Sequence, residues 1–340
     1  MATIDDVAKR AGVSKSSVSR YLNGNFTYLS DAMRAKIAKA IRELNYRPNS
    51  IAQSLKKKET KVIGLVVGDM NPFWMEALRG VQFECSRHGY GLMISSSNWD
   101  VGKEIENIRM LKSRQVDGMI IASMATSVDG VGVYEELIAE QFPFVFADCM
   151  TDEEKADRVV TNTVAGAMEA VEYLIALGHR KIATLLFPVV STVRQERLLG
   201  YKQALRKHGI EVDESLIRVC KESRGSGVDA TIGLLSMPDR PTAIFSTNIH
   251  LTLDVLRGIR QSGLEVPRDI SVVGYDDTDW APLLDPPLTT VSIPAYEMGS
   301  KAASLLFKKI RQTKQTKPKK IEVSPKLMVR LSAITNPRAE

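Results

Sequence analysis

Apolar residues recur at helical spacing through three short segments in the first 45 residues. The segments begin at Thr3, Ser14 and Ser30, and hydroxyl side chains of this kind cap the free N–H groups of a helix N-terminus. In the third segment the apolar face comprises Met33, Ile37, Ala40, Ile41 and Leu44. We therefore expect three short helices that share one small core.

The connection between the first two predicted helices is short and contains Gly12. Two helices joined in this way form a helix-turn-helix when the second presents polar and basic groups outward, here Lys15, Ser16 and Arg20. The partial positive charge of the second helix's N-terminus and these donors suit base edges and phosphates in a major groove. The alternative is a plain three-helix module with a solvated polar face.

Beyond residue 60, apolar β-branched runs alternate with amphipathic helical stretches, which predicts parallel sheets covered by helices. There are too many units for one sheet, so we expect two lobes that divide near residue 161, with a ligand cleft where strand ends converge. Strands are predicted at 62–67, 91–95, 119–122, 144–147, 182–187, 243–246, 270–274 and 289–293, and helices near 73–87, 103–114, 164–177, 194–208 and 250–262.

The charge of the chain is unevenly distributed. Residues 1–60 hold 12 Lys and Arg against 5 Asp and Glu, whereas residues 61–300 hold 23 against 33. A small basic unit beside an acidic body is expected when only the small unit meets a polyanion such as DNA. A second basic run, 301–320, is interpreted as a solvated helix end and loop.

Several function classes lack support. The 340 residues contain neither a membrane-length apolar stretch nor a signal-peptide pattern, so we expect a cytoplasmic protein without a membrane partner. The three cysteines, Cys85, Cys149 and Cys220, have no metal-clamping spacing and are expected to be buried thiols. Neither a nucleotide-binding glycine motif nor His-Glu-x-x-His occurs, so we expect no catalytic residue, metal or cofactor.

The chain resembles the LacI/GalR family of bacterial transcription regulators along its length. In the first sixty residues the likeness lies in Ile4-Asp5-Asp6-Val7-Ala8, Ala11-Gly12-Val13-Ser14, Val18-Ser19-Arg20, Leu22-Asn23, Leu44-Asn45-Tyr46-Arg47-Pro48-Asn49 and Ala52-Gln53-Ser54-Leu55. Further on it lies in Asn71-Pro72-Phe73, Gly178-His179-Arg180-Lys181-Ile182, Arg197-Leu198-Leu199-Gly200-Tyr201, Gly274-Tyr275-Asp276-Asp277 and Pro287-Leu288-Thr289-Thr290-Val291.

The resemblance implies a small all-α helix-turn-helix head and an α/β two-lobed, periplasmic-binding-protein-like body with parallel sheets. The expected domains are the head at 1–47, a hinge helix and linker at 48–60, and an effector-binding and dimerisation domain at 61–340. Lobe 1 would comprise about 61–161 and 293–322, and lobe 2 about 162–292 and 323–340. We expect a homodimer that binds a pseudo-palindromic duplex operator as a repressor.

The resemblance also implies which residues contact DNA. Lys15, Ser16 and Arg20 would lie in the major groove, and Leu55 would be a minor-groove wedge that kinks the duplex. Residues 49–55 are too few to hold a helix alone, so we expect them to fold when paired on DNA; the alternative is a flexible basic linker. The expected contacts are Thr3, Ser14, Lys15, Ser16, Ser19, Arg20, Asn23, Asn49, Ala52 and Leu55.

For the effector, the resemblance implies that Arg197 and Asp276 fix a small molecule. Carboxylates and a guanidinium satisfy vicinal hydroxyls, and aromatic rings cover an apolar sugar face, so we expect a sugar-type ligand. Arg194 would favour a sugar acid over a neutral sugar, unless it is a solvent-facing arginine. The expected site comprises Phe73, Trp74, Asp148, Arg194, Arg197, Asn248, Asp276 and Trp280.

Two departures from the family pattern affect this part of the cleft. Ile249-His250 follows Asn248 where the family commonly has an acidic residue, and Asp254 stands where a small residue is usual. Two rival functions are a sugar-binding transport receptor, which would share the two-lobed body but not residues 1–60, and a sugar-metabolising enzyme, which turnover assays would distinguish.

Overall fold

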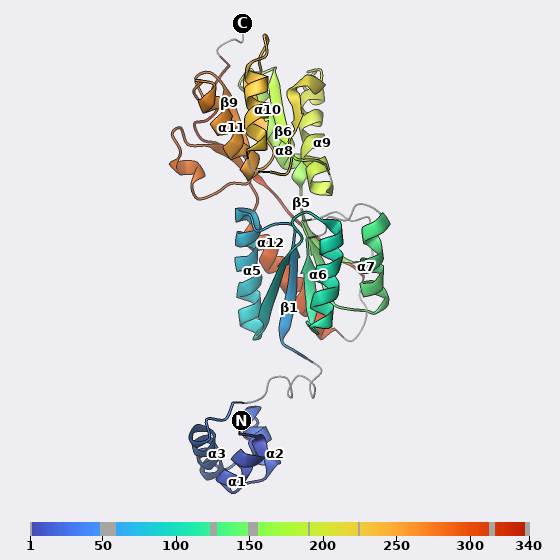
Figure 1. Ribbon diagram of the computed structural model, residues 1–340, viewed down its shortest axis with the longest axis vertical. Coiled ribbons are helices and arrows are strands. Elements are labelled where there is room, and N and C mark those ends of the chain that lie inside the picture. The colour runs from blue at the N-terminus through green and yellow to red at the C-terminus, as the bar shows by residue number, and fades with distance from the viewer. Residues whose placement is uncertain are drawn as a thin grey trace. The chain divides into compact units, whose positions relative to one another are not determined.

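The computed structural model describes residues 2–47, 59–122, 128–148, 156–189, 191–223, 225–312 and 317–336. The chain divides into two compact units, a head over Met1–Lys61 and a body over Val62–Glu340. Figure 1 shows the head as a cluster of helices and the body as two lobes, each with its own sheet.

The head contains α1 (Ile4–Ala11), α2 (Lys15–Leu22) and α3 (Asp31–Glu43). The predicted caps are confirmed: the side chains of Thr3, Ser14 and Ser30 each accept a backbone hydrogen bond from the first turn of their helix. Helix α1 ends at Gly12, whose φ of 67° is left-handed and therefore suits glycine.

The core of the head forms where the three helices meet, around Val7, Val18 and Ile37. Four of the five predicted apolar positions of α3 belong to this cluster or pack against it. The prediction for Met33 is wrong, because its side chain is 36% exposed. Met33 lies in the first turn of α3, one turn before Ile37, and is outside the cluster.

Lobe 1 is a parallel six-stranded sheet in the order β11-β5-β4-β3-β1-β2. Its helices are α5 (Pro72–His88), α6 (Val101–Ser113), α7 (Val128–Ala139) and α12 (Ala295–Arg311). Its strands are β1 (Val62–Val67), β2 (Gly91–Ser96), β3 (Gly118–Ile121), β4 (Phe144–Ala147), β5 (Asp157–Thr161) and β11 (Lys320–Val323).

Lobe 2 holds a second six-stranded sheet in the order β12-β10-β9-β8-β6-β7, in which β12 is antiparallel to β10. Its strands are β6 (Ile182–Leu186), β7 (Ile217–Val219), β8 (Ala243–Ser246), β9 (Ser271–Tyr275), β10 (Thr289–Ser292) and β12 (Lys326–Met328). Its helices are α8 (Thr163–Ala176), α9 (Thr192–Lys207), α10 (Ser226–Leu235) and α11 (Ile249–Gln261), with short 3-10 turns η1 (Glu214–Leu216) and η2 (Ala281–Leu283).

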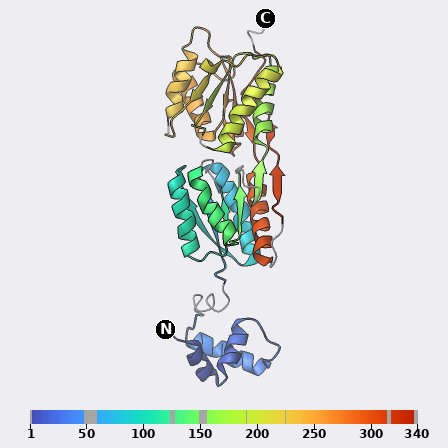
Figure 2. The same cartoon turned by 90° about the vertical axis from the view of Figure 1, so that its right-hand side faces the viewer.

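The described chain passes between the lobes after β5, after β10 and after β11. Figure 2 shows β5 and β11 side by side near this junction. The predicted fold class is confirmed, and the eight predicted strands and five predicted helices are present with ends displaced by at most two residues. Strand β2 differs in burial: Met93 and Ile94 are exposed, because β2 is an edge strand with one neighbour.

The contact between α5 and α12 gives a prediction for stability. A Cβ atom at Gly299 would lie 2.0 Å from the backbone oxygen of Ala77, so Gly299→Ala forces the two helices apart. We expect this change to lower the free energy of unfolding by about 1–3 kcal/mol, measured by urea unfolding and tryptophan fluorescence. The matched control is Gly233→Ala in α10, where a Cβ meets nothing within 4 Å, and we expect it to stabilise by about 0.5–1 kcal/mol. Equal effects would contradict the packing described.

Candidate functional site

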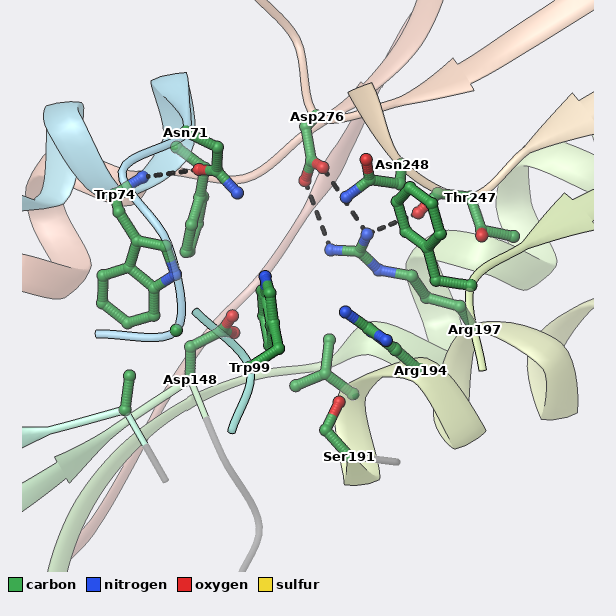
Figure 3. Close-up of a pocket in the computed structure, with 15 residues that line it drawn as sticks. Asn71, Trp74, Trp99, Asp148, Ser191, Arg194, Arg197, Thr247, Asn248 and Asp276 are labelled. Atoms are coloured by element: carbon green, nitrogen blue, oxygen red, sulfur yellow. Dashed lines mark hydrogen bonds and ion pairs between the residues drawn. The ribbon is translucent and has the colours of Figure 1, made fainter. Parts of the chain in front are cut away.

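A cavity lies between the two lobes of the body, at the carboxyl ends of their parallel strands (Figure 3). This is where ligands bind in open parallel sheets, because loops and helix N-termini converge there. From lobe 1 it is lined by Gly68, Asn71, Phe73, Trp74, Trp99, Ala122 and Asp148. From lobe 2 it is lined by Phe187, Ser191, Val193, Arg194, Arg197, Thr247, Asn248 and Asp276.

An ion pair between Arg197 and Asp276 lies on the lobe-2 side of the cavity. The Arg197 Nη2 atom is 3.2 Å from Asp276 Oδ1, and the two side chains are 9% and 6% exposed. Arg197 also donates to the backbone oxygen of Thr247, and its guanidinium lies 3.9 Å from the centre of the Tyr275 ring. The Nε group of Arg197 is buried and has no hydrogen-bond partner among the described residues.

Asp148 follows β4 and faces this pair from lobe 1. Burial raises its pKa to about 7, against the opposing effects of Arg197 and of the hydrogen bond that Thr161 Oγ1 donates at 3.0 Å. The neighbouring carboxylates of Asp276 and Glu196 raise the pKa further. Asp148 can therefore offer a ligand hydroxyl either a carboxylate acceptor or a carboxylic-acid donor near neutral pH.

The raised pKa of Asp148 predicts a pH effect on stability. Between pH 4 and 7 the Asp148 carboxyl is protonated in the folded protein, whereas in the unfolded chain it has already lost its proton, at its ordinary pKa of 3.8. The free energy of unfolding of the wild type therefore falls as the pH rises through this range. Asp148→Asn removes this cost, and between pH 4 and 8 its stability should rise relative to wild type by on the order of 2–4 kcal/mol. Urea unfolding at several pH values measures this. The exposed Asp279→Asn is the control, and parallel curves for Asp148→Asn and wild type would contradict the burial effect.

Aromatic rings line the cavity from both lobes. The Phe73 and Trp74 rings meet edge to face at 5.2 Å. The guanidinium of Arg194, from lobe 2, lies 4.4 Å from the Trp99 ring of lobe 1 and 5.4 Å from the Phe187 ring. A Cβ atom at Gly68 would lie 3.0 Å from the Trp99 indole, so a glycine at this position leaves room for the ring.

Strained backbone is found in the loops around this cavity. Trp99, Asp148 and Asp276 all line it and all have positive φ, at 61°, 51° and 69°. Positive φ is uncommon outside glycine and is least expected for a bulky residue such as tryptophan. Strained conformations cluster at ligand sites, because the surrounding structure fixes them there to orient functional side chains.

The structure brings together most of the predicted effector residues. Phe73, Trp74, Asp148, Arg194, Arg197, Asn248 and Asp276 line the cavity. Trp280 does not lie among the lining residues; it precedes η2 and packs partly buried against the core of lobe 2. The carboxylate of Asp254 also points elsewhere, because it accepts hydrogen bonds from the backbone N–H groups of Gly225 and Gly227 at 3.0 and 3.1 Å.

Sequence reasoning places the loop 96–100 at the cleft but does not single out Trp99 within it, and it misses Phe187 and Ser191. Trp99 lies in the loop after a predicted strand, and that position was the available signal. Phe187 lies at the end of a predicted strand, and no local pattern distinguishes Ser191 as a cavity residue. Two lining residues also have structural roles: Asn71 and Asn248 cap α5 and α11 through their side-chain oxygens.

In the head, the predicted DNA-contacting residues lie at helix ends and on the exposed side of α2. Lys15 Nζ is 2.8 Å from Asp5 Oδ2, whereas the Arg20 guanidinium lies 5.3 Å from the Tyr28 ring centre. Ser16 and Arg20 are exposed, Ser19 is half-buried, and Asn23 ends α2 with its side chain donating to the Ser19 backbone oxygen. Asn49, Ala52 and Leu55 lie outside the described residues.

Within the described residues, no three His, Cys, Asp or Glu side chains are grouped so that they could hold a metal ion. Nor is any helix of those residues long and apolar enough to span a bilayer.

Comparisons with known proteins match both units. Residues 3–49 match the family "Bacterial regulatory proteins, lacI family", and residues 171–333 match "Periplasmic binding protein-like domain". The chain is 35% identical to the ribose operon repressor of Escherichia coli, over 98% of this chain and 100% of the relative. It is 36% identical to the transcriptional regulator DegA of Bacillus subtilis, over 97% of each chain.

Among solved structures, the lac repressor dimer bound to operator and the anti-inducer ONPF is similar to this chain. The TM-score is 0.87 at 29% identity, and the match covers 98% of this chain and 99% of that one. The family match of the head, the relatives that cover nearly the whole chain and the matching solved structure all indicate the same family. The protein therefore belongs to the lacI family of bacterial regulatory proteins and is a DNA-binding transcriptional regulator.

Proposed function

We propose that this protein is a repressor whose affinity for its operator is controlled by a small sugar-type ligand in the cavity between the lobes. The observation that carries the ligand class is the Arg197–Asp276 pair with Asp148 opposite, in a cavity that also presents aromatic rings. Paired donors and acceptors suit vicinal hydroxyls, and rings suit the apolar face of a sugar. The similar ribose operon repressor is named for a sugar operon.

We propose that Lys15, Ser16 and Arg20 lie in the major groove, with Thr3, Ser14, Ser19 and Asn23 nearby. The support is that α2 is capped at Ser14 and that its polar side is exposed. One helix-turn-helix covers a half-site, so a pseudo-palindrome requires two heads about one helical turn apart, 34–36 Å. Residues 48–60 would link each head to its body, with Asn49, Ala52 and Leu55 contacting DNA.

A homodimer would supply the two heads. Lobe 1 has exposed apolar side chains that a second copy could cover, with Met75 44%, Phe83 50% and Met93 41% exposed. The similar lac repressor structure is a dimer on operator. Sedimentation of the full chain at micromolar concentration is expected to give a dimer, and a monomer that nevertheless binds a palindrome tightly would contradict this part of the proposal.

The ligand must bind one arrangement of the dimer better than the other, because otherwise no shift in operator affinity follows. Selection of duplexes from a random library, followed by fluorescence anisotropy with and without candidate sugars, tests the whole proposal. We expect a two-fold symmetric sequence to be enriched and at least one sugar-type ligand to change its affinity. Absence of any preferred duplex would sink the regulator mechanism, and an unchanged affinity across all sugars and sugar acids would sink the ligand class.

A further inference from the structure

Helix α9 presents its N-terminus to the cavity without a side-chain cap. The N-cap residue Ser191 lines the cavity and is 5% exposed, but its side chain accepts no hydrogen bond from the first turn. Asn71 and Asn248 do accept such bonds at the other two helix N-termini that line the cavity. With no hydrogen-bond partner for the Ser191 hydroxyl among the described residues, this donor is free to meet a ligand at the positive end of the helix.

Arg194 lies one turn into α9, and Figure 3 shows it beside Ser191 with Trp99 opposite. Its side chain is 11% exposed, and its guanidinium lies near the Trp99 and Phe187 rings. The Nη1 group donates to the Pro188 backbone oxygen at 2.9 Å and pairs with Glu222. Nη2 and Nε donate to none of the described residues, so one edge of a positioned guanidinium remains available.

We propose that this uncapped turn is a carboxylate subsite, so that the effector is a sugar acid held by Ser191 and Arg194 at its acid group and by Arg197 and Asp276 at its hydroxyls. This inference rests on the proposed sugar-type ligand and specifies its charge. An arginine edge matches a planar carboxylate with two parallel hydrogen bonds. A helix N-terminus adds donors and favours an anion.

The surrounding charges favour a single negative charge over a phosphate dianion. Glu222 pairs with Arg194 and Asp276 pairs with Arg197, so the two arginine charges are balanced and only the partial positive charge of the α9 N-terminus is left over. Asp148 faces the same space from lobe 1, and burial raises its pKa to about 7, so it can take up a proton and avoid repelling one carboxylate. A phosphate with nearly two charges would face all three carboxyl groups.

Matched ligand sets test the proposal on the full chain. For glucose, galactose and mannose, the neutral hexose, its aldonate, its uronate and its 6-phosphate are compared by thermal shift and by titration calorimetry. We expect at least one acid to bind about 10–100-fold more tightly than its neutral and phosphorylated counterparts, the range of charge-assisted hydrogen bonds. Binding of the neutral sugar equal to that of the acid, or preference for the phosphate, overturns the carboxylate subsite while leaving a sugar-type effector standing. Failure of every compound overturns both proposals.

Three variants assign the selectivity to the subsite. Arg194→Met and Ser191→Ala should each weaken the acid selectively, whereas Arg206→Gln removes a charge from the exposed far end of α9 and should change nothing. Glu222→Gln removes the carboxylate that competes for Arg194 and should tighten acid binding several-fold, a gain that misfolding cannot mimic. The assignment would be contradicted if Arg194→Met lowered the affinity for the acid and for the neutral sugar equally, or if Glu222→Gln did not raise the affinity for the acid.

Discussion

Asp276→Ala is expected to abolish the response of operator binding to ligand and to lower the free energy of unfolding of the body by about 3–5 kcal/mol. The change leaves the Arg197 charge buried without its partner, at a side-chain exposure of 9%. It also removes a proposed acceptor for ligand hydroxyls. Alanine tolerates the left-handed backbone of this position, φ 69°, less well than aspartate does, which adds a smaller cost.

Two measurements separate the effects of this substitution. Urea unfolding followed by tryptophan fluorescence reports on the body, because all three tryptophans lie there. Fluorescence anisotropy on operator, with and without effector, reports on regulation, and operator binding itself should persist because the head is a separate compact unit. Asp276→Asn keeps the shape and tests the charge alone.

The neighbouring Asp277 provides a matched control. It also forms an ion pair, with Arg330 at 2.8 Å, but it does not line the cavity. Asp277→Ala is therefore expected to destabilise the body while retaining the ligand response. An Asp276→Ala protein that still responds to effector, or an Asp277→Ala protein that does not, would contradict the role given to the Arg197–Asp276 pair.

The fold was predictable from the sequence because local signals agreed with the global architecture. Capping residues such as Thr3 and Ser30 define helix starts, and continuous apolar runs mark strands buried on both faces. Edge elements carried weaker signals. Strands β7, β11 and β12 are three or four residues long and partly exposed, so they have no apolar run from which they could be predicted.

The site was predictable where chemistry and position coincide, as at Arg197 and Asp276, which are polar residues of family motifs that border the cleft. Trp280 shows the limit of this reasoning, because an aromatic residue near a strand end can pack into the core instead. Trp99 shows the converse, because its place in the cavity depends on a left-handed backbone and on the space above Gly68. Gly68 is far from Trp99 in the sequence, and a tryptophan gives no local signal for a left-handed backbone.

The charge distribution is consistent with two units that handle different partners. The head carries the basic excess, whereas residues 61–300 are net acidic. In the cavity the two arginines are each paired with a carboxylate. The attraction for a polyanion is thus concentrated in the head. The body can bind or release its ligand without itself attracting DNA.

Arg20→Ala is expected to weaken operator binding by about 1–3 kcal/mol, roughly 5–150-fold, and to reduce discrimination among operator variants. Arg20 is exposed on α2, and in the described part of the head its guanidinium lies against a tyrosine ring without an ion-pair partner. Lys15 pairs with Asp5 and must give up that contact to meet DNA, so Lys15→Ala should cost less.

Anisotropy titrations of selected and scrambled duplexes at several salt concentrations distinguish the roles of these side chains. Loss of a base contact lowers affinity for the selected duplex much more than for the scrambled one, whereas loss of a phosphate contact weakens both and reduces the salt dependence. The control is Arg42→Ala, which removes an exposed charge from α3 and should leave discrimination unchanged. If Arg20→Ala retains full discrimination, α2 does not recognise bases through this residue, and the proposed orientation of the head on DNA is wrong.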